Sequence, residues 1–256
     1  MTNLTSKDKL FRIVFIIVVL MLYGCDPLYK TQLCKSYVIC YEKLDAIGTT
    51  VIENSNSFLI HFEYAGVPIR YSCKSKGEEK EIYDALCRKH NDLNYNKHRV
   101  FSDDLPDEIL SYIDKDFLSI GITTIDDFDE LHPAGSDISD IVRFMSWSPI
   151  KYINSGYSKY YQYDSDSMSE AFNTVMPIYY GEEYLGKNSE CTCYPIDKMV
   201  NELTPEDLFL LGDDCLWYIG FVHFEKLPDK QGDYSFNVRM IADTGETLET
   251  SVTMTF

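Results

Sequence analysis

The sequence predicts a mainly β fold, an antiparallel β-sandwich of the immunoglobulin-like kind with a few short helices. The last 41 residues contain three stretches in which apolar and polar residues alternate, separated by short turns. Such alternation is typical of antiparallel strands with one buried face. A sheet with one apolar face needs a second layer over it, and a content of 20 tyrosines suits half-buried sheet surfaces.

The first 24 residues predict an export signal. Lys7, Lys9 and Arg12 precede an uninterrupted apolar run of 11 residues at 13–23. A membrane-spanning helix needs about 20 apolar residues, whereas the apolar core of a signal peptide needs roughly 7–15. We therefore expect residues 1–24 to be a lipoprotein signal peptide that is cleaved off.

The junction Leu22-Tyr23-Gly24-Cys25 resembles the lipobox of bacterial lipoproteins, although Tyr23 replaces the usual small or β-branched residue. The resemblance implies that Cys25 becomes the lipid-modified N-terminus. An ordinary secreted form and an uncleaved anchor are the alternatives. A lipid anchor would hold the protein at the membrane of the cell envelope, as an outer-membrane lipoprotein that is periplasmic or surface-exposed.

Three regions are expected after the signal. Residues 25–35 are predicted to be a tether, 36–115 an N-terminal α+β part, and 116–256 the C-terminal β-sandwich part. The last two can also form one domain, because a chain of this length buries a sizeable core either way.

The N-terminal part contains one predicted hairpin and two predicted helices. Residues 58–64 alternate, and residues 67–72 follow after Ala65-Gly66, which predicts a β-hairpin. Residues 77–90 predict a helix, with acidic residues in the first turn and basic residues in the last. Proline near the start of residues 106–110 predicts a second short helix.

The C-terminal part begins with a predicted strand at 117–125, whereas residues 145–190 follow no clear pattern. A helix is expected after Thr204, because Thr204 can cap it and Asp207 can reach back to the cap. Gly212 would end this helix. The three final alternating stretches predict sequential strands joined as an antiparallel meander.

The net negative charge of the chain excludes some classes of binding partner. The net charge is −18, and the signal carries +2, so the exported part carries −20. Nucleic acids and anionic membrane surfaces require a basic face. We therefore expect no nucleic-acid partner and interpret the acidity as a contribution to solubility.

Seven cysteines remain in the exported part. An oxidising compartment favours disulfides, and an odd number leaves at least one thiol over. We expect one bond within the 34–87 group and one that joins Cys215 to Cys191 or Cys193. A zinc site that includes His223 is the alternative, although its spacing fits no standard pattern. The disulfide candidates are Cys34, Cys40, Cys73, Cys87, Cys191, Cys193 and Cys215.

No motif for a nucleotide, a cofactor or a common hydrolase is present, so we expect no cofactor and no metal. Two weaker candidates remain. Asp164, Asp166 and Glu170 could bind calcium through hard oxygens, or could simply form a solvated loop. His132 could act as a general base oriented by Asp129 in the acidic loop, or could be a turn residue.

Several of these features together resemble a known group of proteins. The basic and apolar start that ends in Gly24-Cys25, residues 129–136 and the terminal hairpin are similar to uncharacterised lipoproteins of the Bacteroidetes. The resemblance implies display in the outer membrane. It supplies no catalytic residues.

These observations predict a binding or interaction module on the cell envelope, with a glycan or a protein as ligand. An aromatic-rich segment could provide the platform, because tyrosine and tryptophan rings pack while their polar ends stay wet. A structural subunit of a surface assembly and a carboxylate-based hydrolase are the alternatives, and we lean against an enzyme. The predicted binding residues are Trp147, Tyr157, Tyr160, Tyr161 and Tyr163.

Overall fold

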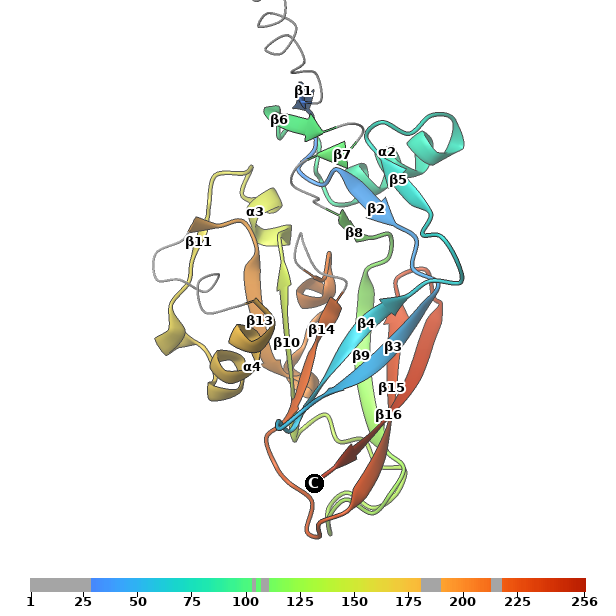
Figure 1. Ribbon diagram of the computed structural model, residues 1–256, viewed down its shortest axis with the longest axis vertical. Helices are drawn as coiled ribbons and strands as arrows, with labels where there is room; N and C mark the ends of the chain where they lie inside the picture. The colour runs from blue at the N-terminus through green and yellow to red at the C-terminus, as the bar shows by residue number, and fades with distance from the viewer. Residues whose placement is uncertain (1–28, 103–104, 107–110, 181–189, 213–217) are drawn as a thin grey trace, which may run out of the picture.

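The computed structural model of the chain describes residues 29–102, 105–106, 111–180, 190–212 and 218–256 (Figure 1). Two antiparallel sheets packed face to face form the main body, and a tyrosine-rich cap covers one end. The predicted class, a mainly β sandwich with a few short helices, is confirmed. The predicted signal peptide and Cys25 lie outside the described residues.

The larger sheet has five strands, each antiparallel to its neighbours. β10 and β14 are buried at nearly every position, because one face of this sheet meets the second sheet and the other is covered by helix and loop. The strand order is β13 (Tyr194–Met199), β10 (Val142–Ser148), β14 (Tyr218–Phe224), β4 (Ser57–Glu63) and β3 (Ala46–Ile52).

The smaller sheet contains β9 (Phe117–Thr124), β15 (Asp233–Ala242) and β16 (Thr247–Thr255), with β15 in the middle. Buried and exposed residues alternate along β15 and β16, because only one face of this sheet is covered. Gly245 has a φ of 84° in the turn between them, a conformation that glycine adopts without steric cost. The predicted strand at 117–125 and the final two strands are confirmed.

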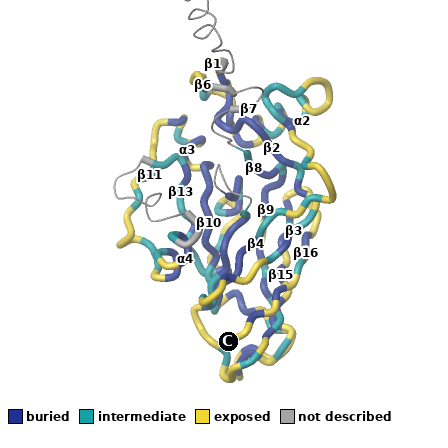
Figure 2. The backbone as a smooth tube through the Cα atoms, in the orientation of Figure 1, coloured by how far each residue is buried: buried dark blue, intermediate teal, exposed yellow. Residues whose placement is uncertain are grey.

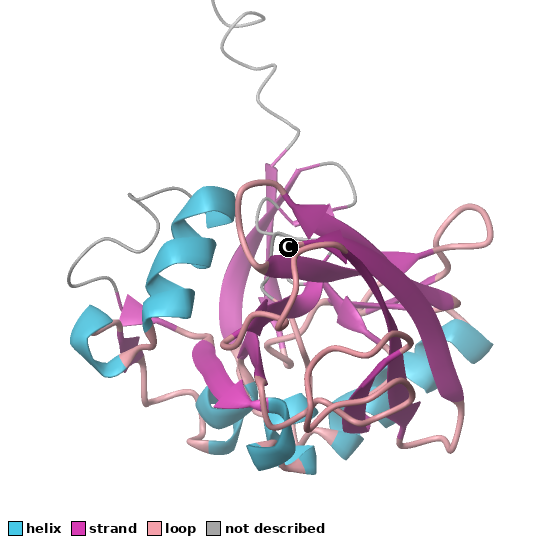
Figure 3. Cartoon of the chain, turned by 90° about the horizontal axis from the view of Figure 1, so that it is seen from below, coloured by secondary structure: helices cyan, strands magenta, loops and turns pink. Residues whose placement is uncertain are grey.

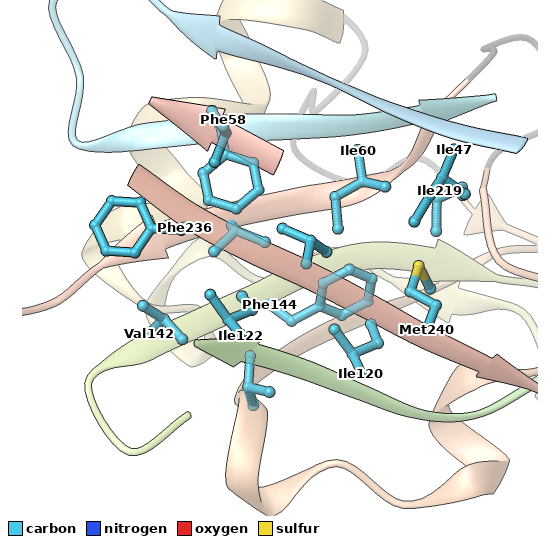
Figure 4. Packing of buried hydrophobic residues seen from close by; sticks show 14 of the residues in the cluster. Ile47, Phe58, Ile60, Ile120, Ile122, Val142, Phe144, Ile219, Phe236 and Met240 are labelled. Carbon is cyan, nitrogen blue, oxygen red and sulfur yellow. The ribbon is translucent and has the colours of Figure 1, made fainter. Parts of the chain in front are cut away.

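Apolar side chains from the two sheets interdigitate in one core (Figure 4). Phe58, Ile60 and Phe144 project from the larger sheet toward Ile120 and Met240 of the smaller one. Burial of each such side chain contributes about 1.5–3 kcal/mol, so this core is the main source of stability.

The predicted C-terminal meander is wrong in one strand. β14 lies between β10 and β4 in the larger sheet, while β15 pairs with β9. Residues 225–232 cross between the sheets, and Phe224 then packs against Phe236 with ring centroids 4.7 Å apart. Because β14 is apolar on both faces, a central position in the covered sheet is where both faces are buried.

The predicted hairpin of residues 58–64 and 67–72 is also wrong. β4 instead forms its hairpin with β3, through a turn in which Asn54 has a φ of 58°. Asparagine tolerates this left-handed conformation better than most residues. The second stretch supplies β5 (Arg70–Ser72), which pairs with β2 (Cys40–Glu42) in the cap.

The cap combines short strands with one helix. Helix α2 (Glu78–Lys89) confirms the predicted helix, with three acidic residues in its first turn and two basic residues in its last. β8 (Ser111–Ile113) completes the sheet of β5 and β2, and a second sheet contains β1 (Tyr29–Cys34), β6 (Lys97–Ser102) and β7 (Leu105–Pro106).

Two predictions in the cap need correction. Residues 29–34 were expected within the tether, but they form β1, whose backbone groups are paired with β6. Pro106 was expected near the start of a helix, but it lies in β7 at a sheet edge, where a residue without an N–H is tolerated. Residues 107–110 lie outside the described residues.

Helices lie around the outside of the strands (Figure 3), and the buried backbone is concentrated in the sheets (Figure 2). Helix α4 (Glu170–Tyr180) covers the outer face of the larger sheet, where Phe172 meets Trp147. The remaining short elements are α3 (Ile150–Asn154), β11 (Tyr161–Gln162), β12 (Glu190–Cys191) and the 3-10 turns η1 (Ser165–Ser167), η2 (Val200–Glu202) and η3 (Pro205–Leu208).

The sandwich crosses the boundary expected between 36–115 and 116–256. Strands β3 and β4 come before that boundary, yet they share a sheet and a hydrophobic core with strands that come after it. No helix in the described part of the chain is both long enough and apolar enough to span a bilayer.

Candidate functional site

A pocket of about 530 Å³ lies where the cap meets the sandwich. The end of α2, the start of β9, helix α3, the η3 turn and the β15–β16 turn contribute its walls. This volume falls within the range of small-ligand sites. The lining residues are Lys89, His90, Asn91, Asp116, Leu118, Ile150, Lys151, Asn154, Lys198, Thr204, Glu206, Asp207, Phe209 and Asp243.

A buried histidine anchors one wall. His90 caps the C-terminus of α2, and its ring Nε2 lies 2.8 Å from Asp116 Oδ2. Its Nδ1 lies 3.0 Å from the hydroxyl of Tyr41, and the two rings stack. Since both ring nitrogens are engaged by buried groups, neither is available to move a proton for a substrate.

Asp116 is the centre of this wall and is only 1 % exposed. Oδ1 accepts a hydrogen bond from the backbone N–H of Leu210 at 3.1 Å, and Oδ2 also lies 2.7 Å from Lys89 Nζ. Burial raises the pKa of the Asp116 carboxyl, but the bonds from His90 and Lys89 outweigh it and hold the pKa below its ordinary value. Asp116 is therefore a fixed anion.

Lys89 ties the helix to a third segment. Its Nζ also lies 2.7 Å from Asp243 Oδ2 in the β15–β16 turn, and the backbone N–H of Asp243 donates to Asp116 O at 2.9 Å. Burial lowers the pKa of Lys89, but the two carboxylates more than compensate and raise it. Helix, strand and turn are thereby held together by one charged group.

The opposite wall is held by a capping box. The N–H and hydroxyl of Thr204 donate to Asp207 Oδ2 at 2.9 and 2.8 Å, which confirms the predicted cap at this residue. The predicted helix as far as Gly212 is wrong, because the segment forms only the short 3-10 turn η3, which ends at Leu208. Lys198 Nζ reaches both Asp207 oxygens at 2.8–2.9 Å. Partial burial raises the pKa of Asp207, yet Lys198 and Thr204 keep it below its ordinary value.

Other lining groups face the pocket without such partners. The side-chain amides of Asn91 and Asn154 make no hydrogen bond to any other described residue. Leu118, which is 43 % exposed, lies with Ile150 and Phe209 as the apolar part of the lining. The arrangement combines rigid charged walls with free amides and an apolar patch, which suits binding of a polar molecule that has one apolar face.

The predicted aromatic residues do not form one platform. Trp147 is 3 % exposed and packs in the core under α4, and Tyr157 is buried in the cap. Tyr161 and Tyr163 are half-buried beside α4. Tyr160 has the most exposed ring, at 39 %, and it lies against Tyr152. Tyr157 belongs to the core of the cap, whereas Trp147, Tyr161 and Tyr163 belong to the core beneath α4, so these rings serve mainly in packing.

The acidic loop holds its histidine as a turn residue. His132 Nδ1 lies 2.8 Å from Asp129 Oδ1, and Nε2 lies 3.1 Å from Asp140 Oδ1. Lys226 adds an ion pair to Asp129 at 2.7 Å. Both imidazole nitrogens are bound to carboxylates of the same loop region, which favours the interpretation of His132 as a turn residue over that of a general base.

No disulfide joins any two of the cysteines that the structure describes, so the predicted bond within the 34–87 group is wrong. Burial is the main cause that raises the pKa of the Cys40 and Cys87 thiols to about 11. These cysteines pack as small apolar side chains. Cys215, the predicted partner of Cys191 or Cys193, lies outside the described residues.

Neither metal alternative gathers a ligand set within the described residues. His223 Nδ1 instead lies 2.8 Å from the hydroxyl of Ser57. Asp164 accepts from the backbone N–H of Asp166 at 3.1 Å, which makes it the cap of η1. An aspartate in that role stabilises a turn.

Sequence reasoning missed the residues that build the pocket. In the sequence, His90 is only one of the basic residues at the end of the predicted helix, and no pattern assigns a role to Asp116. No motif links them, because they are 26 positions apart and meet only when the cap folds onto the sandwich. Comparison with protein-family models, with curated proteins and with solved structures gives no match for this chain.

Proposed function

We propose that the chain is an exported, lipid-anchored protein of the cell envelope that binds a small ligand in the pocket between cap and sandwich. The export signal and Cys25 support the location. The pocket supports binding, because its walls are held in place before any ligand arrives. Preorganisation of this kind reduces the free-energy cost of ordering side chains on binding.

One observation carries the proposal. The charged lining groups bond to each other across three chain segments, while the amides of Asn91 and Asn154 are left facing the pocket. Both asparagines are exposed beside an apolar patch, so a ligand in the pocket can replace the water at their amides.

The hydrolase alternative has one feature in its favour. Asp116 and Asp243 both contact Lys89, so two carboxylates lie close together at the pocket. A general acid in glycoside hydrolysis needs a raised pKa, however, and the pKa of buried Asp116 is lowered. Asp116 is therefore better suited to hold the wall than to donate a proton.

The structural-subunit alternative would require a strand that can leave the fold or an open sheet edge. The last strand, β16, is an edge strand of the smaller sheet, but it is paired with β15 along its whole length, and it also approaches β3, where the Thr49 hydroxyl donates to Ser251 O at 2.9 Å. A donor strand would lie free of its own domain. This geometry favours the binding module.

A thermal-shift experiment tests the proposal. The processed protein, purified from membranes in detergent, is heated with neutral sugars, free amino acids, short carboxylic acids or inorganic phosphate at millimolar concentration. A ligand of the native state raises the unfolding temperature in a saturable way. We expect at least one of these four classes of compound to raise the unfolding temperature, and we expect the Asn154→Ala variant to lose most of that increase.

Asn237→Ala is the matched control, because Asn237 is an exposed asparagine on the outer face of the smaller sheet, away from this pocket. It should keep the full shift. If no set stabilises the protein, or if Asn154→Ala responds like the parent protein, the pocket is not a ligand site.

A further inference from the structure

We infer that the ligand of this pocket is a neutral, hydroxyl-rich molecule, a monosaccharide or disaccharide. The inference rests on the proposed function of small-ligand binding and adds the chemical class of the ligand. It is carried by the charge balance of the walls, the free amides and the apolar patch.

Most charged groups of the walls are paired with one another, and the three lysines and four acidic residues of the lining leave a formal charge of only −1. Lys89 is neutralised by Asp116 and Asp243, and Lys198 is neutralised by Asp207. An anionic ligand would have to compete with these carboxylates for the lysines, and a cationic ligand would have to compete with the lysines. Ionic selection of either sign is therefore unfavourable.

The free polar groups suit hydroxyls. Each amide of Asn91 and Asn154 offers a carbonyl oxygen that accepts and an NH₂ that donates. A hydroxyl also donates and accepts at the same atom, so one amide can bind two neighbouring hydroxyls of a sugar ring. Asn91 follows the C-cap residue of α2 and Asn154 is the last residue of α3, so they reach the pocket from separate walls.

The apolar patch suits the other side of a sugar. Pyranose rings present a face of C–H groups, which is favourable against an aromatic or aliphatic surface. Phe209 provides the ring, and Leu118 and Ile150 extend the surface. A fully ionic small molecule has no such face and would leave this patch in contact with water.

A free amino acid is the main competitor. Lys151 and Glu206 also line the pocket, and they could bind the two charges of a zwitterion. The ammonium of Lys151 already lies over the ring of Tyr194, 5.7 Å from its centroid. The amides and the patch are more extensive, so the geometry favours the sugar.

The experiment is titration calorimetry on the processed full-length protein in detergent. The probes are a panel of neutral hexoses, N-acetylhexosamines and their disaccharides, with glucuronate, inorganic phosphate, glycine and lysine as charged probes. We expect saturable binding of at least one neutral sugar in the millimolar range or tighter. The charged probes should bind at least about tenfold more weakly.

Asn154→Ala should weaken sugar binding roughly tenfold, as loss of an amide that bonds twice implies. Asn237→Ala should leave it unchanged.

Preferential binding of glucuronate, phosphate or an amino acid would overturn the sugar assignment and keep the pocket as a ligand site. Absence of binding by every probe would overturn both. Sugar binding that Asn154→Ala does not change would place the sugar elsewhere and overturn this inference.

Discussion

At the scale of single residues, Asp92 has the most demanding environment. It is fully buried in the cap, and its carboxylate accepts from the backbone N–H groups of Tyr37 and Val38 at 2.6 and 2.8 Å. The Tyr157 hydroxyl donates a third bond at 2.9 Å. Burial raises the pKa of Asp92 although these bonds lower it. The carboxylate thus connects the start of the cap to the segment after α3.

We predict that Asp92→Ala lowers the free energy of unfolding by about 3 kcal/mol or more, because it leaves three buried donors without an acceptor. Urea denaturation of both proteins measures this difference. Asp229→Ala removes an exposed aspartate and should change stability by no more than about 0.5 kcal/mol. Equal stability of all three proteins would mean that water reaches the donors.

The pKa of Asp129 is shifted in the opposite direction to that of Asp92. Burial raises the pKa of Asp129, but bonds from Lys226, His132 and the backbone outweigh it and place the pKa well below its usual range. A carboxyl with a lowered folded-state pKa stabilises the protein above its unfolded pKa, near 4, and this contribution is lost as the pH falls below that value.

Accordingly, Asp129→Ala should be less stable than the parent protein at pH 7, and the gap should shrink as the pH falls from about 4 toward 2. Glu130→Ala is the matched control, because Glu130 is the exposed neighbour in the same loop. Its curve should follow the parent protein. Denaturation midpoints at several pH values provide the test, and a gap that is independent of pH would show that the loss is not electrostatic.

At the scale of elements, the packing of β14 against β10 in the larger sheet depends on a glycine. A Cβ atom at Gly220 in β14 would lie 2.5 Å from the Phe144 ring and 2.8 Å from the carbonyl oxygen of Met145. Gly121 in β9 has open space at the same atom. Both glycines lie in strands, so alanine changes the strand propensity in the same way at each position. A difference between the two variants therefore measures the steric clash at Gly220.

We therefore expect Gly220→Ala to destabilise the protein by about 1–3 kcal/mol through overpacking. Gly121→Ala should be neutral or stabilise it by up to about 1 kcal/mol, because it restricts the unfolded chain. Thermal unfolding of the two variants side by side measures both. Similar melting temperatures would show that β10 can shift to accept the methyl group.

The last strand is an integral element of the sandwich. Leu248, Val252 and Met254 of β16 are buried in the common core. We predict that Met254→Ala costs about 2–5 kcal/mol, whereas Ser251→Ala on the exposed face stays within about 0.5 kcal/mol. Denaturation curves test this, and a small effect of Met254→Ala would be expected only from a strand that is loosely attached.

At the scale of the whole molecule, the chain is a sandwich with a cap (Figure 1), and the residues that line the proposed ligand pocket come from both parts. The described chain starts with β1 in the cap, at the end of the molecule opposite the loop that contains Asp129. An anchor at Cys25 would therefore join the molecule through the cap.

We predict that Cys25 carries the lipid. Metabolic labelling with a fatty-acid analogue should mark the parent protein, while Cys25→Ala should stay unlabelled and keep its signal peptide. Cys73→Ala is the control, because that half-buried thiol lies in the folded cap and should not affect labelling. Equal labelling of the parent and Cys25→Ala, or a mature N-terminus elsewhere, would refute the assignment.

Features that depend on residues close together in the chain could be predicted from the amino-acid pattern alone. The β15–β16 hairpin follows from alternation and a glycine turn, α2 follows from charges at its ends, and the Thr204 cap follows from Asp207 three residues later. Each of these structures is stabilised by contacts within a few positions of the chain, so the local pattern is sufficient to predict it.

Contacts between segments that are far apart in the chain could not be predicted in this way, because they depend on how the whole molecule packs. Local alternation could not show that β14 enters the larger sheet, that β5 pairs with β2, or that Trp147 and Tyr157 are buried. Local alternation also could not show that His90 contacts Asp116, which lies 26 positions further along the chain. An apolar strand or an aromatic ring can pack equally well against many partners, and which partner it contacts depends on how the whole core is packed.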